Sequence, residues 1–317
     1  MKNRLNYQKF ILFFMASLFM WSCTEEPVRP EWPLSALIFH SVKDKQVAFT
    51  ALTHSAVSWQ WDFGDGNSST EQNPVHVYDE GGYYVATLTA KDKSGSSTTA
   101  EVKLAIALTP YALLTGDHTA DDYQGKTWKL TANHSNGGDY LANADADLTV
   151  VKGTPKPLPT GIFDLQFAMG DIYKDEYTFF YDGSYKHNVK EDGAAFGGLV
   201  YQMVTSGGAN VINANGEDYG LCIAKYTPET GAKFTYTESE NLAVPSVYGA
   251  GGVVTYPGVS TLDFSGTEFI GFRDFQKKVI LKSITDNSMQ LVMFMAASPK
   301  YLPANTHALV LSFEVVN

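Results

Sequence analysis

The sequence is poor in cysteine and in basic residues. It holds 2 cysteines in 317 residues, and 23 lysines and arginines stand against 34 aspartates and glutamates. At roughly 150 residues per domain the length predicts about two domains, each large enough to bury a core without disulfides or metals. The net charge of −11 makes polyanions such as nucleic acid and anionic lipid headgroups poor partners. We therefore expect no nucleic-acid partner.

Recognisable catalytic strings are also missing. No glutamate is followed two positions later by aspartate, so the Glu-x-Asp-x-x-Glu strand of common β-sandwich glycosidases is absent. Neither Gly-x-Ser-x-Gly nor His-Glu-x-x-His occurs. Asp175 and Glu176 are adjacent, so on a strand they would face opposite sides. The 7 histidines are scattered, and we expect surface or capping residues rather than ligands. The sequence predicts no catalytic residue, no metal site and no cofactor.

The only long apolar run lies near the start of the chain. It extends from Phe10 to Trp21, follows a basic stretch, and is shorter than the ~20 residues needed to span a bilayer. Residues 1–22 are therefore interpreted as a signal peptide. The run ends at Ser22-Cys23, which resembles a bacterial lipobox, in which the cysteine becomes the lipidated first residue. An ordinary signal peptide or an N-terminal anchor helix is the alternative.

Residues 23–33 are acidic and punctuated by proline, which is typical of a tether. The acidic pair Glu25-Glu26 resembles the surface-export signal of Bacteroidota lipoproteins. This resemblance implies a lipid-anchored, surface-exposed protein of the outer membrane. With Cys23 acylated, Cys222 has no partner for an intrachain disulfide, and its apolar neighbours predict a buried side chain.

Residues 34–107 consist of short alternating segments separated by turn residues, the pattern of a small antiparallel sandwich. Gly64-Asp65-Gly66 closes a tight turn, where glycine tolerates a positive φ. Alternating residues predict two inward-facing sets, which are Trp59, Trp61 and Phe63 on an early strand and Tyr84, Ala86, Leu88 and Ala90 on a later one.

Three strings in this segment belong together. WDFGDG at residues 61–66 is followed by NPVHVY at 73–78 and GYYVATLT at 82–89. They resemble the PKD domain, an immunoglobulin-like β-sandwich of many extracellular bacterial proteins. The resemblance implies that these tryptophan, glycine and tyrosine residues are structural and that the module serves as a spacer; a glycan contact through Trp59 is the alternative. Asp62 and Asp65 alone are too few for a calcium cage.

Residues 108–124 are predicted to be a linker, because strand alternation stops and proline and glycine appear. Residues 125–317 show no convincing helix and are predicted to form a larger, jelly-roll-like β-sandwich. The fold class is therefore all-β throughout. The expected strands are 176–181, 261–264, 268–272, 277–284, 289–295 and 307–316, the last with Leu309, Leu311, Phe313 and Val315 on one buried side.

Several strings of this second module resemble the β-sandwich that follows a PKD domain in surface lipoproteins of Bacteroidota glycan-utilisation systems. They are GKTWKL at 125–130, YKDEYTF at 173–179, DGSY at 182–185 and FIGF at 269–272. The resemblance implies glycan capture at the cell surface. It also implies a possible complex with an outer-membrane glycan transporter.

Sugar recognition needs flat aromatic faces and polar groups for the hydroxyls. Trp128 is predicted to be a core residue. Loop aromatics fit better, because they are less easily buried. Asp139, Asp145 and Asp147 could hold a structural calcium, but they lack a closed loop pattern and are interpreted as a solvated loop. The candidate glycan-binding residues are Tyr140, Tyr248, Tyr256, Arg273, Phe275 and Tyr301.

The sequence therefore predicts a non-catalytic, lipid-anchored surface protein that captures a polysaccharide. Removal of Lys2, Arg4 and Lys9 with the leader leaves a charge of −14, which favours a neutral glycan. A divergent glycoside hydrolase or lyase is one alternative, and would need convergent carboxylates in a cleft of the second module. A structural or adhesive protein is another, and would need an exposed apolar patch.

Overall fold

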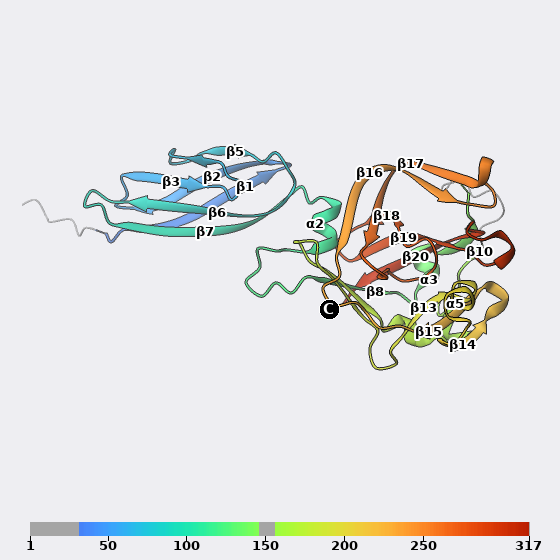
Figure 1. Cartoon of the computed structure of the whole chain (residues 1–317). Coiled ribbons are helices and arrows are strands. Elements are labelled where there is room, and N and C mark those ends of the chain that lie inside the picture. Colours follow the sequence, from blue (N-terminus) through green and yellow to red (C-terminus); the bar gives the residue numbers. More distant parts are fainter. Residues whose placement is uncertain (1–31, 146–155, 317) are drawn as a thin grey trace, which may run out of the picture. The chain divides into compact units, whose positions relative to one another are not determined.

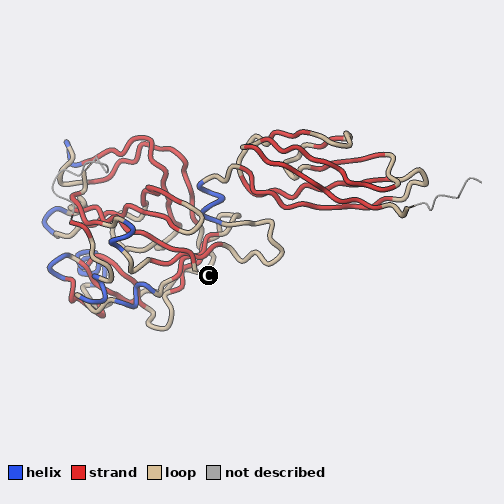
Figure 2. The backbone as a smooth tube through the Cα atoms, turned by 180° about the vertical axis from the view of Figure 1, so that it is seen from behind, coloured by secondary structure: helices blue, strands red, loops and turns tan. Residues whose placement is uncertain are grey.

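The computed structural model describes residues 32–145 and 156–316, which separate into two compact units. The predicted signal peptide, Cys23 and nearly all of the tether lie outside the described residues, as does Asp147. Strands dominate both modules, as Figures 1 and 2 show, which confirms the all-β fold class. Within the described residues, no helix is both long and apolar enough to cross a bilayer.

The first module is built from two antiparallel sheets. One has the order β1-β2-β5 and the other the order β4-β3-β6-β7. In the second sheet, Trp61 of β3 lies opposite Leu88 of β6. The strand bounds are β1 Ser35–Lys43, β2 Gln46–His54, β3 Ser58–Asp62, β4 Ser68–Ser69, β5 Val75–Val77, β6 Gly82–Lys91 and β7 Ser97–Ile106.

The core of this module confirms the predicted alternation. Trp61 packs against Phe49 at a centroid distance of 5.1 Å and stacks with Phe63 at 6.5 Å, and Ala86, Leu88 and Ala90 are fully buried. Trp59, by contrast, is only half-buried. The turn aspartates accept backbone hydrogen bonds within their own turn, from Gly64 N to Asp62 at 2.9 Å and from Asn67 N to Asp65 at 3.0 Å.

The described part of the second module is built around a ten-stranded antiparallel sheet, most of whose strands are labelled in Figure 1. Eight strands follow the order β12-β11-β8-β20-β19-β18-β17-β16, while β9 pairs with β20 and β10 with β9. The bounds are β8 Lys126–Leu130, β9 Tyr140–Asn143, β10 Lys156–Pro157, β11 Glu176–Phe179, β12 Tyr185–Asn188, β16 Phe234–Pro245, β17 Val253–Phe264, β18 Val279–Ile284, β19 Ser288–Met295 and β20 His307–Val315.

A smaller sheet of order β13-β15-β14 packs on one face of the large sheet. Its Phe196 and Ile223 share a core with Leu309, Leu311 and Phe313 of β20. The opposite face of β20 is buried too, because Ala308 and Val310 belong to a second cluster. β20 is thus buried on both faces rather than half-buried as expected. The strands of the small sheet are β13 Ala194–Gly198, β14 Val211–Gly216 and β15 Leu221–Lys225.

Short helices connect these strands, so the expectation of a helix-free module was wrong. One of them, α2, lies inside the predicted linker, where Thr109 caps its N-terminus and Pro110 occupies its first turn. Residues 268–272, expected as a strand, form an irregular buried connection instead. The helices are α2 Pro110–Thr115, α3 His134–Gly137, α4 Ile162–Leu165 and α5 Leu199–Ser206, with 3₁₀ turns η1 Gly170–Tyr173, η2 Glu217–Tyr219, η3 Ala250–Gly252 and η4 Pro299–Tyr301.

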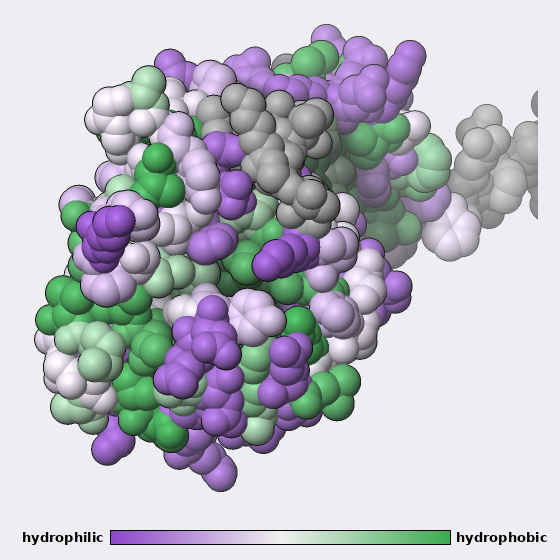
Figure 3. Space-filling model, turned by 90° about the vertical axis from the view of Figure 1, so that its right-hand side faces the viewer, coloured by the Kyte–Doolittle hydropathy of each residue, from purple (hydrophilic) through white to green (hydrophobic). Residues whose placement is uncertain are grey.

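Two expectations about single residues of the second module are confirmed. Trp128 is fully buried and donates from its indole nitrogen to the Leu114 carbonyl at 3.0 Å. Cys222 is buried as well, in the middle of β15. The face drawn in Figure 3 mixes hydrophilic areas with separate hydrophobic ones. Met203 and Val204 on α5 and Ile212 on β14 are among the exposed hydrophobic side chains.

Candidate functional site

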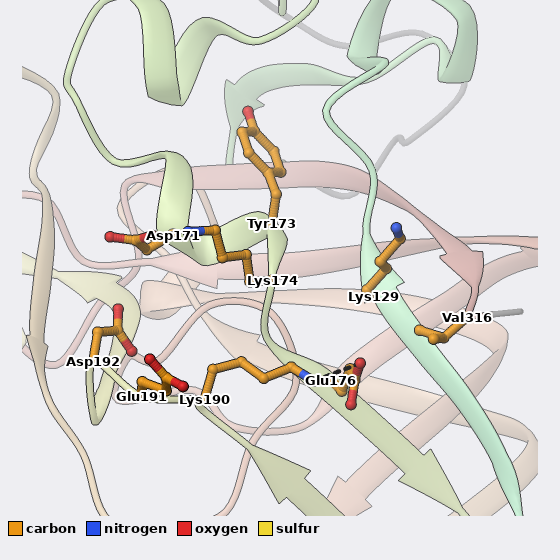
Figure 4. A pocket seen from close by; sticks show the side chains of 9 residues that line it. All are labelled: Lys129, Asp171, Tyr173, Lys174, Glu176, Lys190, Glu191, Asp192 and Val316. Carbon is orange, nitrogen blue, oxygen red and sulfur yellow. Dashed lines mark hydrogen bonds and ion pairs between the residues drawn. The ribbon is translucent and has the colours of Figure 1, made fainter.

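The second module contains a charged groove of about 730 Å³. Volumes of this size are typical of sites for small ligands. Figure 4 shows its side chains, of which seven carry a charge. The lining residues are Lys129, Asp171, Tyr173, Lys174, Glu176, Lys190, Glu191, Asp192 and Val316.

Four segments that are distant in sequence build the groove, the last of them being the C-terminal end of the chain at Val316. Strand β8 brings Lys129, the turn η1 and the start of β11 bring residues 171–176, and the turn between β12 and β13 brings residues 190–192. Gly170 allows η1 to pass close to α4, because a Cβ there would lie 2.6 Å from Asp164 Oδ1. The groove is therefore held by the strand pairing of the large sheet and by one close helical contact.

Ion pairs fix several of the groove side chains. Lys190 contacts Glu176 at 2.5 Å, and Lys174 contacts Asp171 at 2.6 Å. Asp192 accepts from the Ala194 backbone N at 3.2 Å, which shapes its turn. Glu191 is exposed and makes no ion pair or hydrogen bond with the described chain. The groove thus presents both carboxylates and ammonium groups to a ligand.

Tyr173 is the only aromatic residue that lines the groove within the described chain, and a buried relay holds it in place. Its hydroxyl lies 2.9 Å from His134 Nε2, and His134 Nδ1 lies 2.8 Å from Asp139 Oδ2. A carboxylate only accepts, so Nδ1 donates to Asp139, and in a neutral imidazole Nε2 then accepts from the tyrosine hydroxyl. Figure 4 shows the Tyr173 hydroxyl directed away from the charged side chains. Burial raises the pKa of this hydroxyl far above its usual value.

Asp139 is the buried end of this relay. Besides His134, its carboxylate accepts from Ser312 N at 2.9 Å, from Ser312 Oγ at 2.6 Å and from Gln290 Nε2 at 3.1 Å. This bonding occupies the carboxylate, so interpreting Asp139 as part of a solvated loop was wrong. In the described chain, no group of three or more histidine, cysteine or acidic side chains is arranged to hold a metal.

Asp175 lies beside the groove, immediately before β11. Its side chain is buried, and its pKa is raised to about 8, first by burial and then by the charges of Asp192 and Asp171. A carboxyl group with this pKa carries its proton at neutral pH. As predicted, Asp175 and Glu176 differ in environment, since Glu176 alone of the two lines the groove.

The structure places Tyr248 and Tyr301 on neighbouring loops. Val247 N donates to Asn305 O at 3.1 Å, and Ser246 forms a parallel bridge with Asn305. The two tyrosines are 47% and 46% exposed. The pKa of Tyr248 is raised by burial, then by the nearby Asp145 and Tyr301. Of the predicted glycan-binding residues, these two tyrosines best fit the expectation of exposed aromatic side chains.

Two predicted tyrosines do not lie on open loops. Tyr256 is 1% exposed in β17, where it pairs with Leu242 and packs on Phe294 at 5.3 Å. Its prediction as an exposed contact was wrong, because β17 starts at Val253 and continues through Pro257 and Gly258. Tyr140 begins β9 and is half-buried, with the Lys282 ammonium 5.2 Å from its ring centroid.

Arg273 and Phe275 meet at a third place, around Tyr201 of α5. The Arg273 guanidinium lies 5.2 Å from the Tyr201 ring and 4.7 Å from the Tyr226 ring, and Phe275 meets Tyr201 edge-on at 5.1 Å. Asp274 points elsewhere, since its carboxylate accepts from Ala296 N at 3.3 Å. Burial raises the pKa of Asp274 to about 7.

The sequence patterns did not predict the groove or the histidine that supports it. His134 and His187 are buried, so the expectation of surface or capping histidines was wrong for both. In the string from Tyr173 to Phe179, only the adjacent pair Asp175-Glu176 was considered as a source of functional groups, and it was set aside. Acidic and basic residues are mixed at 171–176 and at 190–192, which could have indicated a charged site. The sequence alone does not show that these two segments lie together, because that depends on tertiary structure.

Residues 41–106 match the family model of the PKD domain. Collagenase ColQ1 of Bacillus cereus is 36% identical over 147 residues, which is 46% of this chain and 12% of that protein. Collagenase ColA of Bacillus cereus is 33% identical over 78 residues, or 25% of this chain and 8% of that protein. The chain thus spans about a tenth of the length of these relatives.

Solved structures give two further similarities. The PKD1 domain of the Vibrio cholerae metalloprotease PrtV is 30% identical and aligns over its full length with 24% of this chain, at a TM-score of 0.24. A carbohydrate-binding module of the β-sandwich superfamily covers 91% of this chain, with 13% identity and a TM-score of 0.25, too low to indicate a shared ligand. The family match, together with the paired sheets and the Trp61 core, identifies the first module as a PKD domain.

Proposed function

We propose that this chain is a non-catalytic, lipid-anchored protein that captures a polysaccharide at the cell surface, with the PKD domain as spacer. The observation that carries the proposal is the groove lined by Tyr173, where one immobilised aromatic side chain shares the lining with charged side chains, four of them in ion pairs. Sugar hydroxyls both donate and accept hydrogen bonds, so carboxylates and ammonium groups serve them equally well. A preorganised ring and paired charges lower the ordering cost of binding.

The proposed location is supported by the sequence of the leader. Acylation of Cys23 would hold the chain in the outer membrane, and the acidic tether would present it on the outer surface. There the captured polysaccharide could be passed to an outer-membrane glycan transporter. We propose a neutral glycan for the groove, because four acidic side chains line it against three lysines.

Affinity electrophoresis of the full chain against a panel of neutral polysaccharides tests this function. Retardation by at least one polysaccharide is expected, and Glu191→Gln in the groove should weaken it. Glu238→Gln is the matched control, because Glu238 is an exposed glutamate on β16 outside the groove. No retardation by any member of the panel would contradict glycan capture. Equal retardation of both variants and the wild type would show that the polysaccharide binds outside the groove.

A glycoside hydrolase is the second candidate, and Asp175 favours it. A carboxyl that keeps its proton at neutral pH has the protonation state of a general acid, and Asp175 lies next in sequence to Glu176, which lines the groove. Prolonged incubation with a bound polysaccharide, followed by chromatography of the soluble fraction, separates the two functions. Oligosaccharide release that Asp175→Asn abolishes would establish the enzyme. Unchanged polysaccharide supports capture alone.

A further inference from the structure

Arg273 is held between aromatic rings. Its guanidinium carbon lies 4.7 Å from the Tyr226 ring centroid, 5.2 Å from Tyr201 and 5.9 Å from Phe269. Phe275 supports Tyr201 from the edge at 5.1 Å. Arginine stacks readily on aromatic faces, and such contacts restrict the orientation of the planar guanidinium. The N–H donors of the planar guanidinium, which form a fork, are therefore held in one orientation before a ligand binds.

The backbone of Arg273 is fixed as well. Arg273 N donates to Phe196 O at 3.0 Å, and Gly198 N donates to Arg273 O at 2.9 Å. The connection thus adds a short parallel bridge to β13 at Gly197. A Cβ at Gly197 would lie 2.8 Å from the Arg273 carbonyl oxygen, so glycine is required for this approach. The side chain starts from a rigid position next to the small sheet.

No acidic group of the described chain neutralises this guanidinium by contact, since none forms an ion pair or hydrogen bond with it. The carboxylate of Glu229 interacts electrostatically with Arg273 but makes its hydrogen bonds elsewhere. Glu229 accepts from Thr267 N at 2.7 Å and from Thr267 Oγ1 at 2.8 Å. Glu268 is buried and accepts from Glu229 N at 2.5 Å. Arg273 is only half-buried, so its donors are left for solvent or for a ligand.

Arginine is rare in this protein, where it occurs at positions 4, 29 and 273. An unpaired guanidinium in a chain with an excess of acidic groups is a local site for an anion. Its fork matches the two oxygens of a carboxylate or sulfate, and the adjoining rings of Tyr201 and Phe275 are partly exposed and offer an apolar face. A sugar that carries an acidic group presents both of these complementary features.

We propose that Arg273, Tyr201 and Phe275 form a subsite for a single acidic sugar residue, whose oxyanion accepts from the guanidinium. This inference rests on the proposed glycan capture and extends it, because the groove around Tyr173 suits neutral residues. The captured polysaccharide would then carry acidic residues within a largely neutral chain. A uronate carboxylate and a sulfate ester share the required chemistry.

Binding assays on the full chain test the subsite. The probes are galacturonan, glucuronan, alginate and a sulfated galactan, together with fully methyl-esterified galacturonan, which keeps the sugar chain and removes the charge. Arg273→Gln should weaken binding of at least one acidic probe about tenfold or more, and Arg273→Lys, which keeps the charge and loses the fork, about fivefold. Lys282→Gln, which removes another ring-stacked cation, is the matched control.

The pattern across probes distinguishes the possible outcomes. Preference for uronans over the methyl ester identifies a carboxylate ligand, and preference for the sulfated galactan identifies a sulfate. Binding of neutral polysaccharides with no Arg273-dependent binding of any acidic probe would overturn the subsite and leave glycan capture intact. Failure to bind any polysaccharide would overturn both.

A measurement on the wild-type chain covers the case in which a variant is unstable. The arginine side-chain Nε–H signals can be observed by NMR, and the signal lost in Arg273→Lys belongs to Arg273. Galacturonate or sulfate should shift that signal in a saturable manner and leave that of Arg29 in place. Absence of a saturable shift with both anions would overturn the proposal.

Discussion

His134 and Asp139 form a fully buried pair in which the imidazole nitrogen and the carboxylate oxygen lie 2.8 Å apart. Only four residues separate them in the chain, but their hydrogen bonds reach η1 through Tyr173 and β20 through Ser312. The pair therefore joins the wall of the groove to the centre of the large sheet.

Asp139→Asn should destabilise the second module strongly. The amide would retain some acceptor capacity but place an N–H₂ group against existing donors, which leaves buried groups unpaired. We expect a loss of ~2 to 5 kcal/mol in the free energy of unfolding, measured by urea denaturation. Asp286→Asn, on an exposed turn, is the control and should change little. A loss below ~1 kcal/mol would show that the pair contributes little.

Tyr256→Phe should leave the protein as stable as the wild type or make it more stable. The Tyr256 hydroxyl is buried and has no hydrogen-bond partner in the described chain. Its removal relieves a desolvation cost of ~1 to 2 kcal/mol, whereas Tyr256→Ala leaves a cavity and should cost ~3 to 5 kcal/mol. Thermal denaturation of both variants measures this. A clearly destabilising effect of Tyr256→Phe would show that the Tyr256 hydroxyl makes a hydrogen bond in the folded protein.

Asp274 should make stability depend on pH. Its pKa in the folded chain is about 7, above the usual value of about 3.9, because burial disfavours the charged form. The folded state thus binds the proton more tightly, and the stability it contributes is fully present below pH 4 and lost as the pH rises towards 7. Relative to the wild type, Asp274→Asn should gain stability between pH 4 and pH 8. A constant difference across this range would exclude the effect.

Tyr248→Ala and Tyr301→Ala test the exposed pair of loop tyrosines. If the polysaccharide extends over these loops, each change should weaken binding by ~1 to 2 kcal/mol through lost stacking, with little change in melting temperature. Tyr219→Ala is a matched control, since Tyr219 is 43% exposed on η2. Full affinity in the double variant would restrict the site to other surfaces.

Cys23→Ala should abolish acylation. Metabolic labelling with a fatty-acid analogue is expected to mark the wild-type chain and leave the variant unlabelled. The variant should also appear in the soluble fraction after cell lysis, because a lipid anchor is its expected attachment. Equal labelling of the two chains would refute the lipobox interpretation and with it the proposed location.

Local sequence signals predicted most of the strands and the PKD domain, because alternation and turn residues act over a few positions. The predicted strand at 289–295 corresponds to β19 at Ser288–Met295. Tyr256 was mispredicted because Pro257 and nearby glycines suggested a loop. In the structure, pairing between β16 and β17 extends to Pro245 and Val253, and this pairing buries the ring.

The candidate sites depended far more on tertiary structure. Lys190 and Glu176 are joined only because β11 and β12 pair, and Tyr201 reaches Arg273 only because α5 follows β13. No spacing along the chain encodes such contacts. Arg273 and Phe275 were predicted to lie close together because they are neighbours in sequence, whereas their aromatic partner is more than 70 residues away.

Because Cys222 is buried, we expect the described chain not to react with thiol reagents. Its pKa is raised to about 12, so almost no thiolate forms at neutral pH, and its sulfur is shielded within β15. In a chain carrying Cys23→Ala, a cysteine introduced at Glu191 would be the accessible thiol on the groove rim. A fluorophore attached there would report the arrival of a ligand directly, against a background free of native labelling.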